Sequence, residues 1–199
     1  MKFSVAEFFS LAVSAILVSN LVMIYLLSSN VFFKALKSPV SGITYGVLVT
    51  ISTTVASMIA WIINEFIILK FGLNFLYPFA FIFGIIVVEL LIELIFYKFF
   101  SQLRSTLGGL LPASAFNCAV LGLVLINVQH SSNGFLGTTF YGFCAGLGFV
   151  FALFVAASAM ERVRFSTPPS AFKGLPIAFV TASLISLAFM GFSGIQIPY

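Results

Sequence analysis

The sequence predicts an all-α integral membrane protein with six transmembrane helices, arranged as two inverted three-helix repeats. Three observations support this fold class: an apolar composition, six long apolar runs and a correspondence between the two halves of the chain. Hydrophobic residues make up 61% of the 199 residues and charged residues only 7%, and the mean hydropathy is +1.21. An average soluble domain is about 25% charged. Too few polar groups are available to cover a surface against water, so lipid must cover it.

The net charge of +4 does not indicate nucleic-acid binding. The lysines and arginines stand singly between apolar runs, whereas a nucleic-acid-binding surface gathers them into a basic patch. The sequence also lacks a phosphate-binding loop, a dinucleotide-binding glycine motif and the HExxH motif of metalloproteases. Nothing in the sequence therefore indicates a self-contained enzyme.

Each of six apolar runs is long enough to cross the bilayer, which takes about 20 residues in a helix. The runs comprise residues 5–27, 43–69, 75–96, 110–128, 135–160 and 175–195. Strands are excluded because they are shorter and because their open edges cannot face lipid. The first run continues well past the possible signal-peptide cleavage site at residues 13–15. We therefore expect that this run is not cleaved and forms the first transmembrane span. Residues 1–199 are thus treated as a single membrane domain.

The positions of lysine and arginine predict the orientation, because these residues concentrate in cytoplasmic loops. Seven of the nine basic residues follow spans one, three and five, and the other two lie on the opposite side. The seven are Lys34, Lys37, Lys98, Arg104, Arg162, Arg164 and Lys173, and the two are Lys2 and Lys70. We expect a multi-pass protein of the plasma or inner membrane with both termini on the non-cytoplasmic side.

The two predicted repeats, residues 5–100 and 106–196, correspond at an offset of about 96 residues. Tyr45 and Tyr141, each followed by glycine, occupy matching places at the starts of spans two and five, and Asn20 matches Asn117. Because each half contains three spans, an odd number, the second half must enter the membrane from the other side. The pattern therefore predicts an inverted repeat.

Inverted repeats often place a functional site near the middle of the membrane, on broken helices. Gly108, Gly109 and Pro112 stand at the entry to span four, so we expect that helix to be broken or to start late. Cys118 follows Asn117 near the middle of this span. A thiolate is a ligand for soft metals, but a membrane cysteine is also a small apolar residue, and the same two interpretations apply to Cys144.

Glu89 and Glu93 lie four residues apart, on one face of span three. Acids inside a membrane are candidates for cation or proton handling, because an uncompensated charge there is costly. Glu93 is near the predicted cytoplasmic end, where Lys98 or Arg104 can pair with it, so we interpret it as structural. Glu89 is the candidate for an ion pathway.

Several segments carry a resemblance to a known family: residues 110–112 (LLP), 117–122 (NCAVLG), 141–143 (YGF), 168–169 (PP) and 186–194 (SLAFMGFSG). They span the second half of the chain, and the first half matches more loosely through residues 18–20 (VSN) and Glu93. Together they resemble the RnfA/NqrE type of membrane subunit from the Rnf and Nqr redox-driven ion pumps.

This resemblance implies a membrane subunit that pairs with a homologous subunit of opposite topology, and a 2Fe-2S cluster shared between the two. It also implies electron transfer between a cytoplasmic flavin or ferredoxin module and flavins bound to other subunits, coupled to movement of Na⁺ or H⁺. In the family each chain contributes two cysteines, one from the region of the first span and one from the Asn-Cys-Ala motif. Cys118 matches the second of these.

The position of the family's first cysteine is occupied by Asn30, and an amide does not replace a thiolate ligand. For that position to approach Cys118, the first span must be broken or re-entrant. Cys144 is a candidate for the missing ligand. The competing hypothesis is a transporter or structural membrane subunit that keeps the scaffold but has lost the redox centre, with Glu89 acting in ion passage.

Overall fold

The computed structural model describes residues 5–20, 22–24, 39–72, 74–99, 117–129, 134–166 and 169–192, and all regular structure in these segments is helical. The all-α class is therefore confirmed. The helices are α1 (Val5–Val13) with the π-helical turn η1 (Ser14–Val18), α3 (Pro39–Ile63) with η2 (Asn64–Ile68) and α4 (Leu69–Phe71), η3 (Asn74–Leu76), α5 (Tyr77–Phe99), α8 (Cys118–Gln129), α9 (Gly134–Arg164), η5 (Ser170–Phe172) and α10 (Leu175–Met190).

Among the described residues, three helical stretches are long and apolar enough to cross a membrane, namely Ile43–Phe71, Tyr77–Ile95 and Gly134–Val163. Shorter apolar helices occupy Phe8–Val18, Cys118–Asn127 and Leu175–Met190. The first helical stretch ends at Val18, and Ser19 leaves the helical conformation at φ −111° and ψ 39°, as expected for a first span that is broken. The predicted end of the first run at residue 27 lies outside the described residues. Helix α8 begins at Cys118, as expected for a fourth span that starts late.

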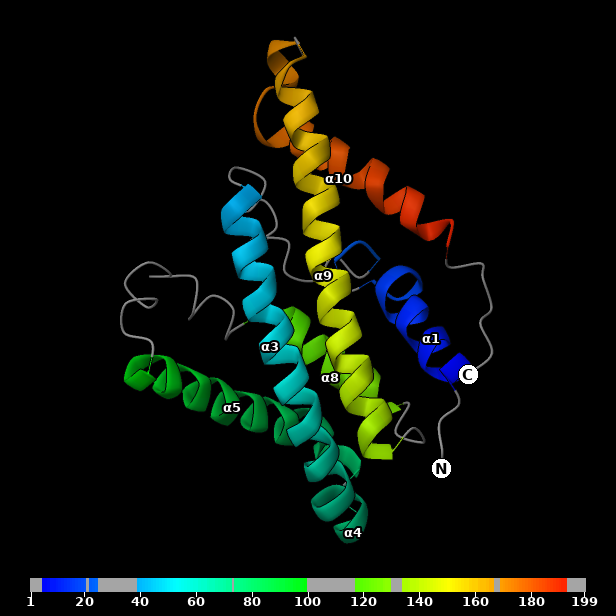
Figure 1. Ribbon diagram of the computed structural model, residues 1–199, viewed down its shortest axis with the longest axis vertical. Helices are drawn as coiled ribbons and strands as arrows, with labels where there is room; N and C mark the ends of the chain where they lie inside the picture. Colours follow the sequence, from blue (N-terminus) through cyan, green and yellow to red (C-terminus); the bar gives the residue numbers. More distant parts are fainter. Residues whose placement is uncertain are drawn as a thin grey trace.

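Helices α3 and α9 form the centre of the molecule and run antiparallel to each other (Figure 1). Small residues line their contact: Gly46 lies against Val150, and Gly146 lies against Thr50. A Cβ atom on Gly146 would stand 2.7 Å from the Thr50 Cα, so only glycine allows this approach of the two backbones. Close packing through small residues is a main source of helix association in lipid.

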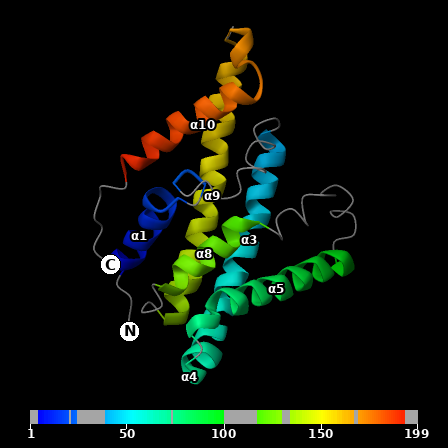
Figure 2. The same cartoon turned by 180° about the vertical axis from the view of Figure 1, so that it is seen from behind.

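Helices α5 and α10 leave opposite ends of this central pair and point to opposite sides (Figures 1 and 2). Thr50 and Gly146, which contact each other, are also 96 residues apart, the offset of the sequence repeat. Equivalent positions of two halves meet only near the axis that relates the halves. The arrangement thus supports the inverted repeat, which stays a prediction.

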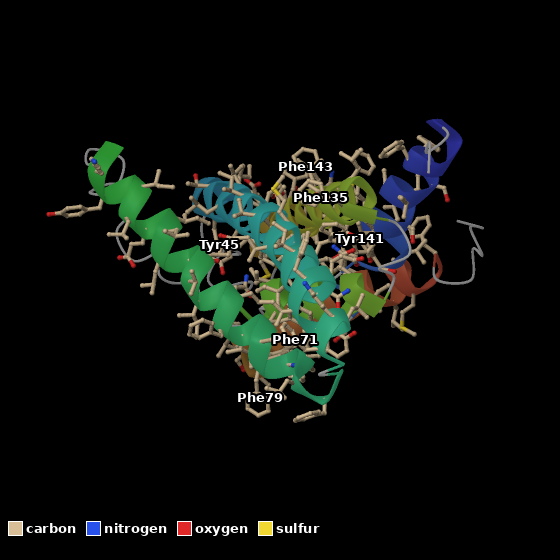
Figure 3. All side chains as sticks on the ribbon, turned by 90° about the horizontal axis from the view of Figure 1, so that it is seen from below. Tyr45, Phe71, Phe79, Phe135, Tyr141 and Phe143 are labelled. Atoms are coloured by element: carbon tan, nitrogen blue, oxygen red, sulfur yellow. The ribbon has the colours of Figure 1, made fainter. Side chains whose placement is uncertain are left out.

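Large apolar side chains cover much of the outside of the described helices. Phe79 and Phe143 are exposed, whereas Tyr45 and Tyr141 are buried between the helices (Figure 3). Helix α5 is the clearest case, since most of its length presents isoleucine, leucine and phenylalanine outward. An exposed apolar area of this kind marks contact with a membrane or with another protein. The chain is accordingly a multi-pass membrane protein.

Substituting Gly146 by alanine should destabilise the α3/α9 contact. The added Cβ meets the backbone of α3, which cannot move aside without shifting the helix, so we expect a loss of about 1–3 kcal/mol in the free energy of unfolding. Gly84→Ala is the control, because its Cβ would meet only the terminal Cδ1 atom of Ile63. Unfolding of both variants in mixed detergent micelles gives the comparison. Equal losses would contradict the proposed backbone contact.

Candidate functional site

Asn20 lies two residues beyond the end of the first helical segment at Val18, and its fully buried side chain makes four hydrogen bonds. Its Nδ2 donates to the carbonyl oxygens of Ile16 and Gly148, both at 2.9 Å. Its Oδ1 accepts from the backbone N–H groups of Val22 and Met23 at 3.1 and 3.2 Å. One side chain thereby satisfies backbone groups on both sides of the break and attaches the break to α9.

Helix α8 begins beside a second buried asparagine. The Oδ1 of Asn117 accepts a hydrogen bond from the Ala119 N–H at 2.9 Å, which is the geometry of an N-terminal cap. Its Nδ2 donates to the hydroxyl oxygen of Tyr45 at 3.0 Å. The Tyr45 ring in turn packs against Phe149, with 6.0 Å between ring centroids. The start of α8 is therefore held against both central helices.

Each asparagine belongs to one half of the chain and bonds to the long helix of the other half. Asn20 reaches Gly148 on α9, and Asn117 reaches Tyr45 on α3. Gly148 and Phe149 lie halfway along α9, which runs from Gly134 to Arg164. Both interruptions therefore lie level with the middle of a helix that is long enough to cross the membrane.

Cys118 is the first residue of α8, directly after the capping asparagine, and is exposed. It opens onto a groove of about 280 Å³ between α5 and α8. The groove is lined by Ile82, Ile85, Ile86 and Glu89 from α5 and by Asn117, Cys118 and Leu121 from α8. The thiol thus stands in a mainly apolar groove at the level of the helix interruptions.

Glu89 lines the same groove and is buried, with 6% of its surface exposed. Ser52 of α3 hydrogen-bonds to its carboxyl group, while the Oε1 atom has no hydrogen-bond partner among the described residues. A buried polar atom without a partner is rare in native structures and calls for an explanation. Glu93, one turn further along, is exposed. The two acids lie one turn apart on α5, but the structure buries the carboxyl group of Glu89 and exposes that of Glu93.

Cys144 lies elsewhere. It is 3% exposed and packs on α9 among Leu11, Leu123 and Tyr141. Leu123 follows Cys118 by five residues, so the two side chains point about 140° apart around α8. Cys144 therefore packs on a different side of α8 from the groove that Cys118 faces. The structure does not bring the two cysteines together at this groove.

A 2Fe-2S cluster is held by four protein ligands, usually four cysteines. The chain has two cysteines in all, and only Cys118 faces the groove. Asn30, at the family's first cysteine position, lies outside the described residues. Among the residues that are described, no three histidine, cysteine or acidic side chains gather as a metal site. The described residues thus offer one thiol at the groove, fewer than the four ligands that such a cluster needs.

Two residues contribute to this site that the sequence analysis did not assign to it. Ser52 touches Glu89 from a helix 37 positions away in the chain, and Tyr45 is a hydrogen-bond partner of Asn117. For Tyr45 a signal existed, because the Tyr-Gly pair recurs in both halves. Ser52 is one of several small polar residues on α3, and nothing in its sequence context distinguishes it from the others.

Comparison with known proteins gives a consistent result. The family described as "Rnf-Nqr subunit, membrane protein" matches residues 8–196. The chain is 39% identical over 189 residues to the A-type subunit of the ion-translocating oxidoreductase complex from Pectobacterium carotovorum subsp. carotovorum (strain PC1), covering 95% of this chain and 97% of that protein. It is 40% identical, with the same coverage, to the protein of the same name from Yersinia pseudotuberculosis serotype O:1b (strain IP 31758).

The bond between Asn117 and Tyr45 can be tested by a double-mutant cycle. Asn117→Ala removes the helix cap, at a cost of about 0.5–2 kcal/mol, and also the bond to Tyr45, which contributes about 0.5–1.5 kcal/mol. Tyr45→Phe should remove the latter bond and leave the helix cap in place. We expect the double variant to be little less stable than Asn117→Ala when unfolding free energies are measured in detergent. Fully additive losses would show that the two side chains do not interact.

Proposed function

Because the chain belongs to the Rnf-Nqr family of membrane subunits, we propose that it is a subunit of an ion-translocating oxidoreductase complex. It lies in the plasma or inner membrane with both termini on the non-cytoplasmic side, beside a homologous subunit of opposite topology. Other subunits of the complex carry the flavins. The names of the relatives support the assignment to such a complex. The distribution of lysine and arginine supports the orientation.

We further propose that Cys118 is a ligand of a 2Fe-2S cluster shared with the partner subunit. The observation that carries this proposal is the position of the thiol: it is exposed at the first residue of a helix that begins level with the middle of α9. A thiol at that depth can face a partner chain across the groove between α5 and α8. The N-terminus of a helix also stabilises nearby negative charge, which suits a thiolate-bound centre.

A bound cluster would supply one-electron transfer at the middle of the membrane, and the residues of this chain would hold and shield it. Asn117 orients the first turn of α8, and with it Cys118, through its bonds to Ala119 and Tyr45. The isoleucines of α5 line the groove and make it mainly apolar. Low water access and local hydrogen bonding are the main means by which a protein sets the potential of such a centre.

A second candidate function is ion transport on the same scaffold without a redox centre. One observation favours it: the buried Oε1 atom of Glu89 has no hydrogen-bond partner among the described residues, as expected for a group that binds a passing cation. In that case Cys118 would be a residue of the subunit interface only. The two candidates differ in whether the purified complex contains iron bound through this chain.

Replacing Cys118 by serine in the assembled complex tests the leading proposal. We expect the iron content to fall and the electron paramagnetic resonance (EPR) signal of the membrane cluster to disappear, because a serine oxygen is a poor substitute for a thiolate. Cys144→Ser is the matched control, since that thiol is buried in the apolar core, and it should leave the signal in place.

Assembly of each variant is checked by size-exclusion chromatography before the spectra are compared. An unchanged signal and full membrane electron transfer in Cys118→Ser would contradict the redox proposal. A complex that contains no iron but moves ions would support the second candidate instead.

A further inference from the structure

Outside the site already described, the clearest surface feature is the end of the molecule where α9 gives way to α10. Both views show this end at one extremity of the long axis, with η5 folded back beside the last turns of α9 (Figures 1 and 2). Arg162 on α9 and Lys173 after η5 are exposed there. Phe172 is also exposed, and Phe165 is 86% exposed. These four side chains, which we call the α9–α10 patch, combine positive charge with apolar surface.

The position of the patch along α9 gives its depth in the membrane. The two helix interruptions lie level with Gly148 and Phe149, at the middle of this long helix. Arg162 lies about 21 Å further along the helix axis than Gly148, at 1.5 Å per residue. The hydrocarbon core extends about 15 Å from the middle of a bilayer, and the headgroups extend to about 20–22 Å. With α9 centred in the membrane, the patch lies at the level of the lipid headgroups.

The positive charges of the patch lack a counterpart within the described chain. Neither Arg162 nor Lys173 forms an ion pair with another residue in the part of the chain that the structure describes. Residues 160–175 also include a third basic residue, Arg164, and a single acid, Glu161. Side chains on a helix lean toward its N-terminus, so Arg162 leans back toward the bilayer. The patch therefore presents an excess of positive charge to the membrane surface.

A partner for this patch must supply negative charge and apolar surface together, at headgroup depth. An anionic phospholipid does so, because its phosphate attracts lysine and arginine. The boundary between its headgroup and its acyl chains accommodates exposed phenylalanine rings. A water-soluble acidic protein matches the charges but does not cover the rings at that depth. The combination of side chains therefore favours a lipid.

We propose that the α9–α10 patch binds an anionic phospholipid, with Arg162 and Lys173 at its phosphate and Phe165 and Phe172 beside the upper part of its acyl chains. This inference goes beyond the proposed function and does not depend on it. No residue of the patch lines the groove at Cys118, and lipid binding requires no redox centre.

The test uses the full-length chain in phosphatidylcholine vesicles, with a fluorescent reporter at the patch. Trp61 is the only tryptophan of the chain, so Trp61→Phe combined with Phe165→Trp leaves one tryptophan, at the patch. Bromine atoms on acyl chains quench tryptophan fluorescence at short range. The vesicles contain either brominated phosphatidylglycerol, which is anionic, or brominated phosphatidylcholine at the same mole fraction. We expect stronger quenching by the phosphatidylglycerol, because the patch concentrates it.

Arg162→Gln and Lys173→Gln, made in the reporter chain, should each lower this preference by about fivefold, the contribution of one basic residue near an anionic membrane surface. High salt should also reduce it, since charges exposed at headgroup level are screened. Lys70→Gln is the matched control. Lys70 is an exposed basic residue near the opposite end of the central helices, so its substitution should leave the preference unchanged (Figure 1).

Equal quenching of the reporter by the two brominated lipids would overturn the inference, as would a preference that survives both glutamine substitutions. Quenching by neither lipid would also reject it, and would indicate that water or protein covers the patch. If the glutamine variants do not reconstitute, the salt dependence of the reporter chain decides alone. A preference that disappears at high salt supports binding of the charged headgroup, and one that persists rejects it.

Discussion

The constraint on which this structure depends is the need to satisfy backbone hydrogen bonds where helices end inside a membrane. In hydrocarbon no water is available for free N–H and C=O groups, so non-helical backbone at that depth must be enclosed by protein. Asn20 and Asn117 meet this need from within the chain. Each amide bonds to the backbone at its own helix end and also to one of the two central helices.

The central pair α3 and α9 determines where these two interruptions lie. Glycines at the crossing let the backbones approach, with Gly146 against Thr50 at the middle of the contact. The asparagines then dock at the level of Gly148 and Phe149. The position of Cys118 follows from this packing, because it is the residue directly after Asn117. The position of this thiol level with the middle of α9 is therefore a consequence of how two long helices cross.

Much of the fold could be predicted from the sequence because it depends on local properties. Apolar runs and the scarcity of charge indicate membrane helices, and the Asn-Cys segment draws attention to Cys118. Helix ends were predicted less well, since an apolar run continues past Ser19 while the helix stops there. That stop depends on a bond between Asn20 and Gly148, 128 positions apart. The contact of Glu89 with Ser52 and the burial of Cys144 likewise arise from packing between helices.

The position of iron in the assembled complex tests the account most directly. A cryo-electron microscopy map, or anomalous scattering collected at the iron edge, would locate any metal relative to the start of α8. The account predicts iron density bonded to the Cys118 sulfur, level with Phe149 and on the side of the groove between α5 and α8. A well-resolved complex in which Cys118 contacts only protein or lipid, with no iron at the helix start, would contradict it.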